Sequence, residues 1–114
     1  MREDKLSIQS MDFAVDIINL VRELKSKKEN IISNQIGRSG TSIGANIREA
    51  HYAHGTADFI GKLQIALKEC SESEYWIELL IESGYCDDKT ILENCNELKK
   101  ILISSINTAK KNNN

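Results

Sequence analysis

The chain has no proline among its 114 residues, and aromatic residues make up only 5% of it. Turn-rich β-folds use proline in their turns and aromatic residues in their strands, so this composition argues against them. Hydrophobic residues account for 40% of the chain and charged residues for 28%, which is typical of long helices in soluble proteins. We therefore predict an all-α protein with a single small domain over residues 1–114.

The sequence also lacks long apolar runs and a strong charge of either sign. No run of about 18 apolar residues could cross a membrane and no secretory signal is recognisable, so we expect a cytoplasmic protein without a membrane partner. The 15 basic and 17 acidic residues give a formal net charge of −2. Such a chain has no overall field that attracts a polyanion, and nucleic-acid binding would need a local basic patch.

Cysteines are few, and their spacing is irregular. Cys70, Cys86 and Cys95 form an odd set without a CxxC pair. Cys70 and Cys95 fall on apolar helical stripes, where a reduced cysteine behaves as a small hydrophobic residue. We interpret both in that way, in preference to a redox or metal-binding role.

Apolar residues recur at helical spacing in four segments, over residues 10–28, 32–53, 57–83 and 88–110. Helices of this length would each be about 30 to 39 Å long, which suits them to one bundle. The connections between them are short, so that consecutive helices should run in opposite directions. The pattern predicts an antiparallel up-down four-helix bundle.

The first of these segments has two apolar stripes side by side. One consists of Phe13, Ile17, Leu20 and Leu24, and the other of Met11, Ala14, Ile18 and Val21. Together they cover about half of the helix circumference, which is wider than one intramolecular contact requires. We therefore expect this helix to contribute to an interface between subunits.

Three glycines interrupt the second segment. Gly37, Gly40 and Gly44 would together cost about 3 kcal/mol relative to alanine in a helix interior. They lie on one side of the helix, beside its isoleucine seam, and form a smooth strip against which another helix can pack closely. The alternative is a kink or break at residues 39–41, with Ser42 capping a restarted helix.

A polar line borders the same seam and consists of Gln35, Ser39, Ser42, Asn46 and Glu49. The third segment has a carboxylate, Glu74, within its apolar arc. An unpaired charge there would cost several kcal/mol, so Ser42, Asn46 or a basic residue should satisfy it. We predict a structural polar network between helices that includes Ser42, Asn46, Glu49 and Glu74.

The run QIGRSGTSIGANIREA at residues 35–50, followed by DFI at 58–60 and EYWIELL at 74–80, resembles a known family. This is the four-helix-bundle family of proteins encoded in intervening sequences of bacterial 23S ribosomal RNA. The resemblance covers nearly the whole chain and implies a small antiparallel bundle that assembles into a ring-shaped homo-oligomer, a homopentamer. Many relatives have proline at the position of Gly44, which is compatible with a kink in the second helix.

A related accessory protein of diversity-generating retroelements forms such a ring and works with a reverse transcriptase and nucleic acid through a strongly basic surface. This chain departs from it in its negative net charge. Arg38 and Arg48 face away from the seam of the second helix and are candidate nucleic-acid-binding residues, because a ring would repeat each of them once per subunit.

Groups suited to catalysis or metal binding are sparse. His51 and His54 could share a metal with Glu49 or with a neighbouring subunit, but no HExxH pattern is present, and histidines near a helix end are more often surface residues. No serine or cysteine lies in a nucleophile elbow, and no glycine-rich phosphate-binding loop occurs. We expect no catalytic residue, metal or cofactor, and no enzyme activity.

Two classes of function stay open. The first is a non-catalytic oligomer associated with nucleic acid, with RNA, DNA or a reverse transcriptase as its partner, and the resemblance favours it. The second is a structural or protein-binding oligomer without nucleic-acid contact. Both classes assume that the protein binds further copies of itself and forms a homo-oligomer.

Overall fold

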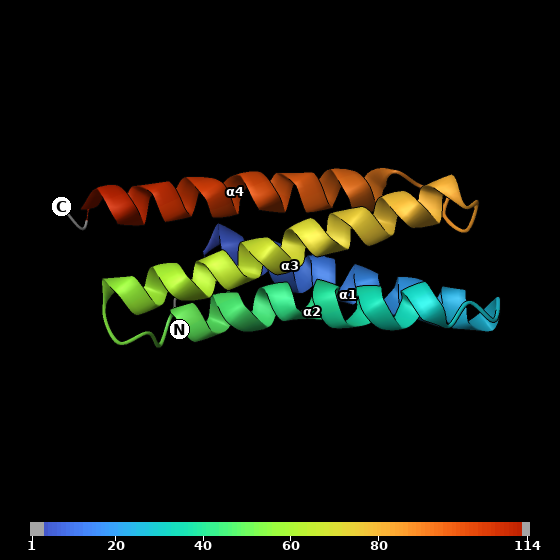
Figure 1. Ribbon diagram of the computed structural model, residues 1–114, viewed down its shortest axis with the longest axis horizontal. Helices are drawn as coiled ribbons and strands as arrows, with labels where there is room; N and C mark the ends of the chain where they lie inside the picture. Colours follow the sequence, from blue (N-terminus) through green and yellow to red (C-terminus); the bar gives the residue numbers. More distant parts are fainter. Residues whose placement is uncertain (1–3, 113–114) are drawn as a thin grey trace.

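The computed structural model describes residues 4–112 and contains four α-helices (Figure 1). They are α1 (Lys5–Ser26), α2 (Ile31–Ala50), α3 (Thr56–Glu82) and α4 (Thr90–Asn112). Consecutive helices run antiparallel and pack against each other, which gives an elongated bundle of 49 × 22 × 21 Å. The all-α four-helix bundle is confirmed. α4 packs mainly on α3 and more lightly on α1.

α1 begins earlier than the apolar periodicity indicated, at Lys5 instead of residue 10. Asp4 is the N-cap residue, and its carboxylate accepts a 2.8 Å hydrogen bond from the backbone N–H of Ser7. Because Asp4 caps the N-terminus, the helix begins before its main apolar stripe. At the other ends the differences are smaller: α2 stops at Ala50 instead of residue 53, and α4 begins at Thr90 instead of residue 88.

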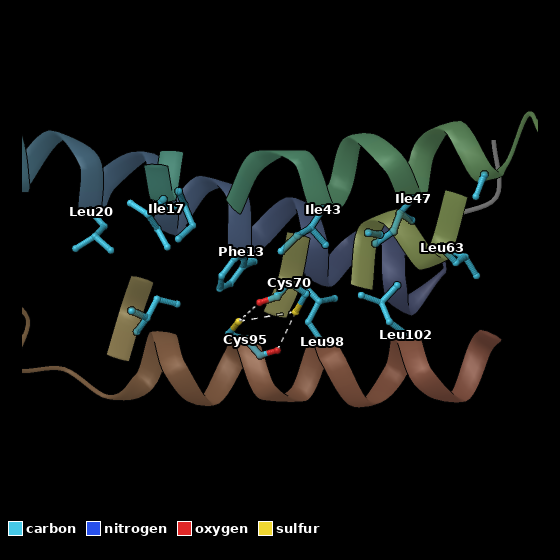
Figure 2. Close-up of a cluster of buried hydrophobic side chains, with 14 of the residues drawn as sticks. Phe13, Ile17, Leu20, Ile43, Ile47, Leu63, Cys70, Cys95, Leu98 and Leu102 are labelled. Atoms are coloured by element: carbon cyan, nitrogen blue, oxygen red, sulfur yellow. Dashed lines mark hydrogen bonds between the residues drawn. The ribbon is translucent and has the colours of Figure 1, made fainter. Parts of the chain in front are cut away.

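The core runs along the bundle where the apolar faces of the four helices meet (Figure 2). It comprises Phe13, Ile17, Leu20, Leu24, Ile36, Ile43, Ile47, Ala50, Leu63, Ala66, Cys70, Ile77, Leu80, Cys95, Leu98, Leu102 and Ile106. The first of the two predicted α1 stripes is therefore buried. Within residues 4–112, none of the helices combines the length and apolarity that crossing a membrane requires.

The three glycines of α2 all face α1. A Cβ atom on Gly40 would overlap the side chain of Ile17, while one on Gly37 would lie 3.4 Å from Val21 and one on Gly44 would lie 3.3 Å from the Ser10 hydroxyl. The helix is continuous from Ile31 to Ala50. The smooth strip is confirmed, and the alternative of a break with a restarted helix is wrong.

The turn before α2 is organised by a buried carboxylate. Glu29 is 7% exposed, and its side chain accepts hydrogen bonds from the backbone N–H groups of Ile31, Ile32 and Ser33 at 3.1, 3.0 and 2.7 Å. These groups have no partner within the helix, so Glu29 caps α2. Burial raises the pKa of Glu29, but the three hydrogen bonds outweigh it and hold the pKa below its usual value.

Candidate self-assembly surface

Four large apolar side chains of α1 lie on the outside of the bundle. Ile8, Met11, Val15 and Ile18 are each about half exposed. Their spacing of three, four and three residues places them in one line about 15 Å long, which we call the α1 stripe. The α1 stripe shares Met11 and Ile18 with the second stripe predicted from the sequence. The other two residues of that predicted stripe, Ala14 and Val21, are partly covered by α2. A contiguous apolar patch of this kind marks an interaction surface.

A groove between α1 and α2 continues this surface. It has a volume of about 440 Å³, and Met11, Ala14 and Ile18 line one side of it. On the other side, Thr41, Gly44 and Ala45 of α2 have small side chains, which keeps the groove open, and Arg48 and Glu49 line it toward the end of that helix. The stripe and the groove together form one largely apolar face that no part of residues 4–112 covers.

Arg38 is paired within the bundle. It reaches from α2 to α3, where its guanidinium donates to Glu69 at 3.2 Å and to Glu72. Glu72 also accepts a 3.1 Å hydrogen bond from the indole of Trp76, which, together with Arg38, keeps the pKa of Glu72 low in spite of burial. The two carboxylates raise the pKa of Arg38. Its charge is thus locally balanced by two acids.

The second candidate arginine, Arg48, is exposed near the end of α2 and lines the α1/α2 groove beside Glu49. Ten residues separate it from Arg38, which corresponds to roughly 15 Å along the helix axis. The structure therefore does not bring Arg38 and Arg48 together in one patch on a single chain.

The predicted polar network is not formed as one unit. Ser42 and Asn46 donate to backbone carbonyl groups of their own helix, at 2.7 and 2.9 Å. Glu49 pairs with Lys62 at 3.3 Å, and Glu74 pairs with Lys99 of α4 at 3.0 Å. Glu74 is satisfied by a basic residue, as expected of a carboxylate in an apolar arc, but it faces α4 instead of α2.

A buried polar contact between α2 and α3 does exist at a different place on the polar line. The hydroxyl groups of Ser39 and Ser73 lie 2.8 Å apart, and both residues are fully buried. Ser39 stood on the predicted line, but its partner depends on how α3 is aligned with α2. The sequence contains no signal for that alignment.

His51 lies close to the start of α1. Its Nε2 atom is 3.0 Å from the Ser7 hydroxyl and 3.3 Å from a carboxylate oxygen of Asp4. A hydrolase triad needs the acid and the serine on opposite ring nitrogens, whereas both contacts here involve Nε2. His54 lies outside this cluster, and no group of three or more potential metal ligands converges within the described part of the chain.

A family model described as 23S rRNA-intervening sequence protein matches residues 3–104. The chain belongs to this family. It is also similar to a crystal structure at 1.70 Å resolution of a protein of unknown function from the S23 ribosomal protein family of Bacteroides thetaiotaomicron VPI-5482. The two are 51% identical with a TM-score of 0.87, over 89% of this chain and 97% of that one. A comparison with curated proteins finds no match.

In this member of the intervening-sequence protein family, the run at residues 35–50 that carried the resemblance holds three helices together. Gly40 allows α1 to approach closely, and Ile43 and Ile47 belong to the core. Arg38 and Ser39 contact α3. The run thus has a structural explanation that requires no ligand.

Proposed function

We propose that the protein is a non-catalytic, self-assembling member of the intervening-sequence protein family, and that the α1 stripe and the α1/α2 groove bind a second copy of the chain. The observation that carries this proposal is the unbroken line of four half-exposed apolar side chains on α1. The other apolar face of α1 is buried in the core of the bundle, so the α1 stripe is not needed for folding of the single chain.

The magnitudes indicate how large the interface must be. Covering the exposed halves of the four side chains of the α1 stripe would contribute about 3 to 6 kcal/mol. Association loses about 4 to 15 kcal/mol of translational and rotational free energy, so the stripe alone does not suffice. The interface therefore includes the groove, and each copy buries on the order of 800 Å².

We propose that this face pairs with a different face of the next copy. Such head-to-tail contacts generate either rings or open filaments, and we propose a closed ring, in which closure limits the number of copies. Five copies are proposed from the family resemblance. A non-catalytic role is supported by the polar clusters, since Arg38 is paired with Glu72, and Glu74 is paired with Lys99, across helices.

The test is the mass of the purified chain by light scattering at micromolar concentration. A pentamer should weigh about 64 kDa, five times the 12.8 kDa of one chain. A mass of 12.8 kDa would overturn the proposal.

A second function, association with nucleic acid, is favoured by the charge of α4. Residues 98–112 contain four lysines and no carboxylate. An exposed face of this helix carries Lys100, Ser104, Asn107, Thr108 and Lys111 around a shallow hollow of about 450 Å³. Ammonium, hydroxyl and amide groups are the donors that bind phosphate oxygens. We propose this α4 face, and not Arg38, as the site where RNA or DNA, with or without a reverse transcriptase, would bind the ring.

A further inference from the structure

Two cysteine side chains from different helices point toward each other in the core (Figure 2). Cys70 lies on α3 and Cys95 on α4, and their Sγ atoms are 3.8 Å apart. Each thiol also donates toward the backbone carbonyl of the other residue, with S···O distances of 3.4 and 3.5 Å. Both residues are fully buried. The sequence identified both as core residues but gave no sign that they face each other.

The nearest buried residues of α3 on either side of Cys70 have small side chains. Ala66 and Ser73 lie about one turn before and after Cys70, and both are buried, so small side chains surround it on α3. A disulfide bond is about 2.05 Å long, and rotation about χ1 of the two cysteines can close most of the remaining separation.

We propose that Cys70 and Cys95 are an oxidisable dithiol, in which a disulfide bond formed within the chain fastens α3 to α4. This inference does not depend on the proposed assembly or on nucleic-acid binding.

With a peroxide as the oxidant, the reaction has two steps. In the first, one of the two thiols loses its proton, its thiolate attacks one peroxide oxygen and the O–O bond breaks, and the leaving hydroxide takes up that proton, so that a sulfenic acid and water are formed. In the second, the sulfur of the other cysteine attacks the sulfenic sulfur, the S–O bond breaks, and the leaving oxygen takes up the proton of the second thiol and departs as water. Overall the two thiols lose two protons and two electrons, and hydrogen peroxide is reduced to two molecules of water.

The geometry treats the two thiols alike, since each donates toward the backbone carbonyl of the other residue at nearly the same distance, 3.4 and 3.5 Å. Either cysteine can therefore react first once the bundle opens, through its thiolate, which is the nucleophilic form.

Oxidant reaches the buried pair through local opening of the bundle. α4 is held mainly by α3 and only lightly by α1, so its separation from the bundle is the opening that exposes both sulfur atoms. Once formed, the disulfide joins residues that are 25 positions apart and restricts that same opening.

The experiment uses the full chain with Cys86→Ser, which removes the half-buried third thiol and leaves only the pair. Hydrogen peroxide should lower the intact mass by about 2 Da, and a reducing agent should restore it. Trypsin digestion of the oxidised protein should give a cross-linked pair of peptides, residues 69–89 and 90–99. The melting temperature should rise by roughly 5 to 15 °C.

Two matched controls are the double variants Cys86→Ser/Cys70→Ser and Cys86→Ser/Cys95→Ser, which should show neither the mass loss nor the rise in melting temperature. The inference is overturned if the Cys86→Ser protein keeps its helical circular dichroism and either its mass is unchanged or its thiols gain oxygen without forming the linked peptides. Linkage only between separate chains would overturn it as well.

Discussion

Gly40 of α2 lies against Ile17 of α1 so closely that a Cβ atom on residue 40 would sit 2.7 Å from Cγ1 of Ile17. Ile17 is fully buried and β-branched, so it has little freedom to move away. This contact explains why a helix tolerates glycine at this position: the close approach of α1 offsets the lower helix propensity.

Gly40→Ala should therefore destabilise the protein. Alanine gains about 1 kcal/mol of helix propensity, whereas overpacking against Ile17 costs about 1 to 3 kcal/mol. The matched control is Gly61→Ala in α3, where a Cβ atom would meet nothing within 4 Å. The control should stabilise the protein by about 0.5 to 1 kcal/mol. Urea unfolding of both variants checks this, and equal stability of the two would contradict the close contact.

Glu29 should make the stability of the protein depend on pH. Its folded pKa is lower than its ordinary value of 4.5, so its carboxylate contribution is fully present above about pH 5 and disappears as the pH falls through the folded pKa. Glu29→Gln should cost about 1 kcal/mol at neutral pH and flatten the loss of stability in acid. Glu82→Gln, at an exposed position near the end of α3, should leave the pH profile unchanged. A Glu29→Gln profile parallel to that of the wild type would show that the cap is not responsible.

Binding to nucleic acid, measured by titration of labelled RNA and single-stranded DNA, should depend on α4. Lys100→Glu with Lys111→Glu should weaken binding at ~50 mM salt for all sequences tested and make it less sensitive to salt, because phosphate contacts carry little sequence information. Lys27→Glu with Lys28→Glu applies the same charge change after α1, at the opposite end of the bundle from Lys111, and should have a smaller effect. Equal effects of the two pairs would point to net charge alone, and absence of binding by the wild type would leave self-assembly as the function.

Apolar spacing and the glycine strip were enough to predict the four helices, the apolar stripes of α1 and the close packing of another helix on α2. These features depend on the 3.6-residue period within one segment, which a sequence displays directly. The start of α1 was missed because the Asp4 cap precedes the main apolar stripe.

Contacts between helices were harder to predict, because they depend on how far one helix is shifted along another. Glu74 meets Lys99 instead of Asn46, and Arg38 pairs with two carboxylates of α3, which was not predicted. The position of Cys70 opposite Cys95 likewise depends on how far α4 is shifted along α3. A shift by one helical turn would change each of these partners while leaving the apolar pattern of every helix intact.

The central claim is that the α1 stripe holds copies of the chain together, and the mass of a Val15→Lys variant by native mass spectrometry tests it most directly. Val15 lies in the middle of the stripe and is 49% exposed, so lysine should be accepted by the isolated bundle but not by an apolar interface. Ile31→Lys is the control, since Ile31 is 78% exposed at the start of α2, outside the stripe. The account predicts that wild type and Ile31→Lys share one assembled mass and that Val15→Lys, with its helical circular dichroism retained, falls to 12.8 kDa. An assembled Val15→Lys protein of wild-type mass would contradict it.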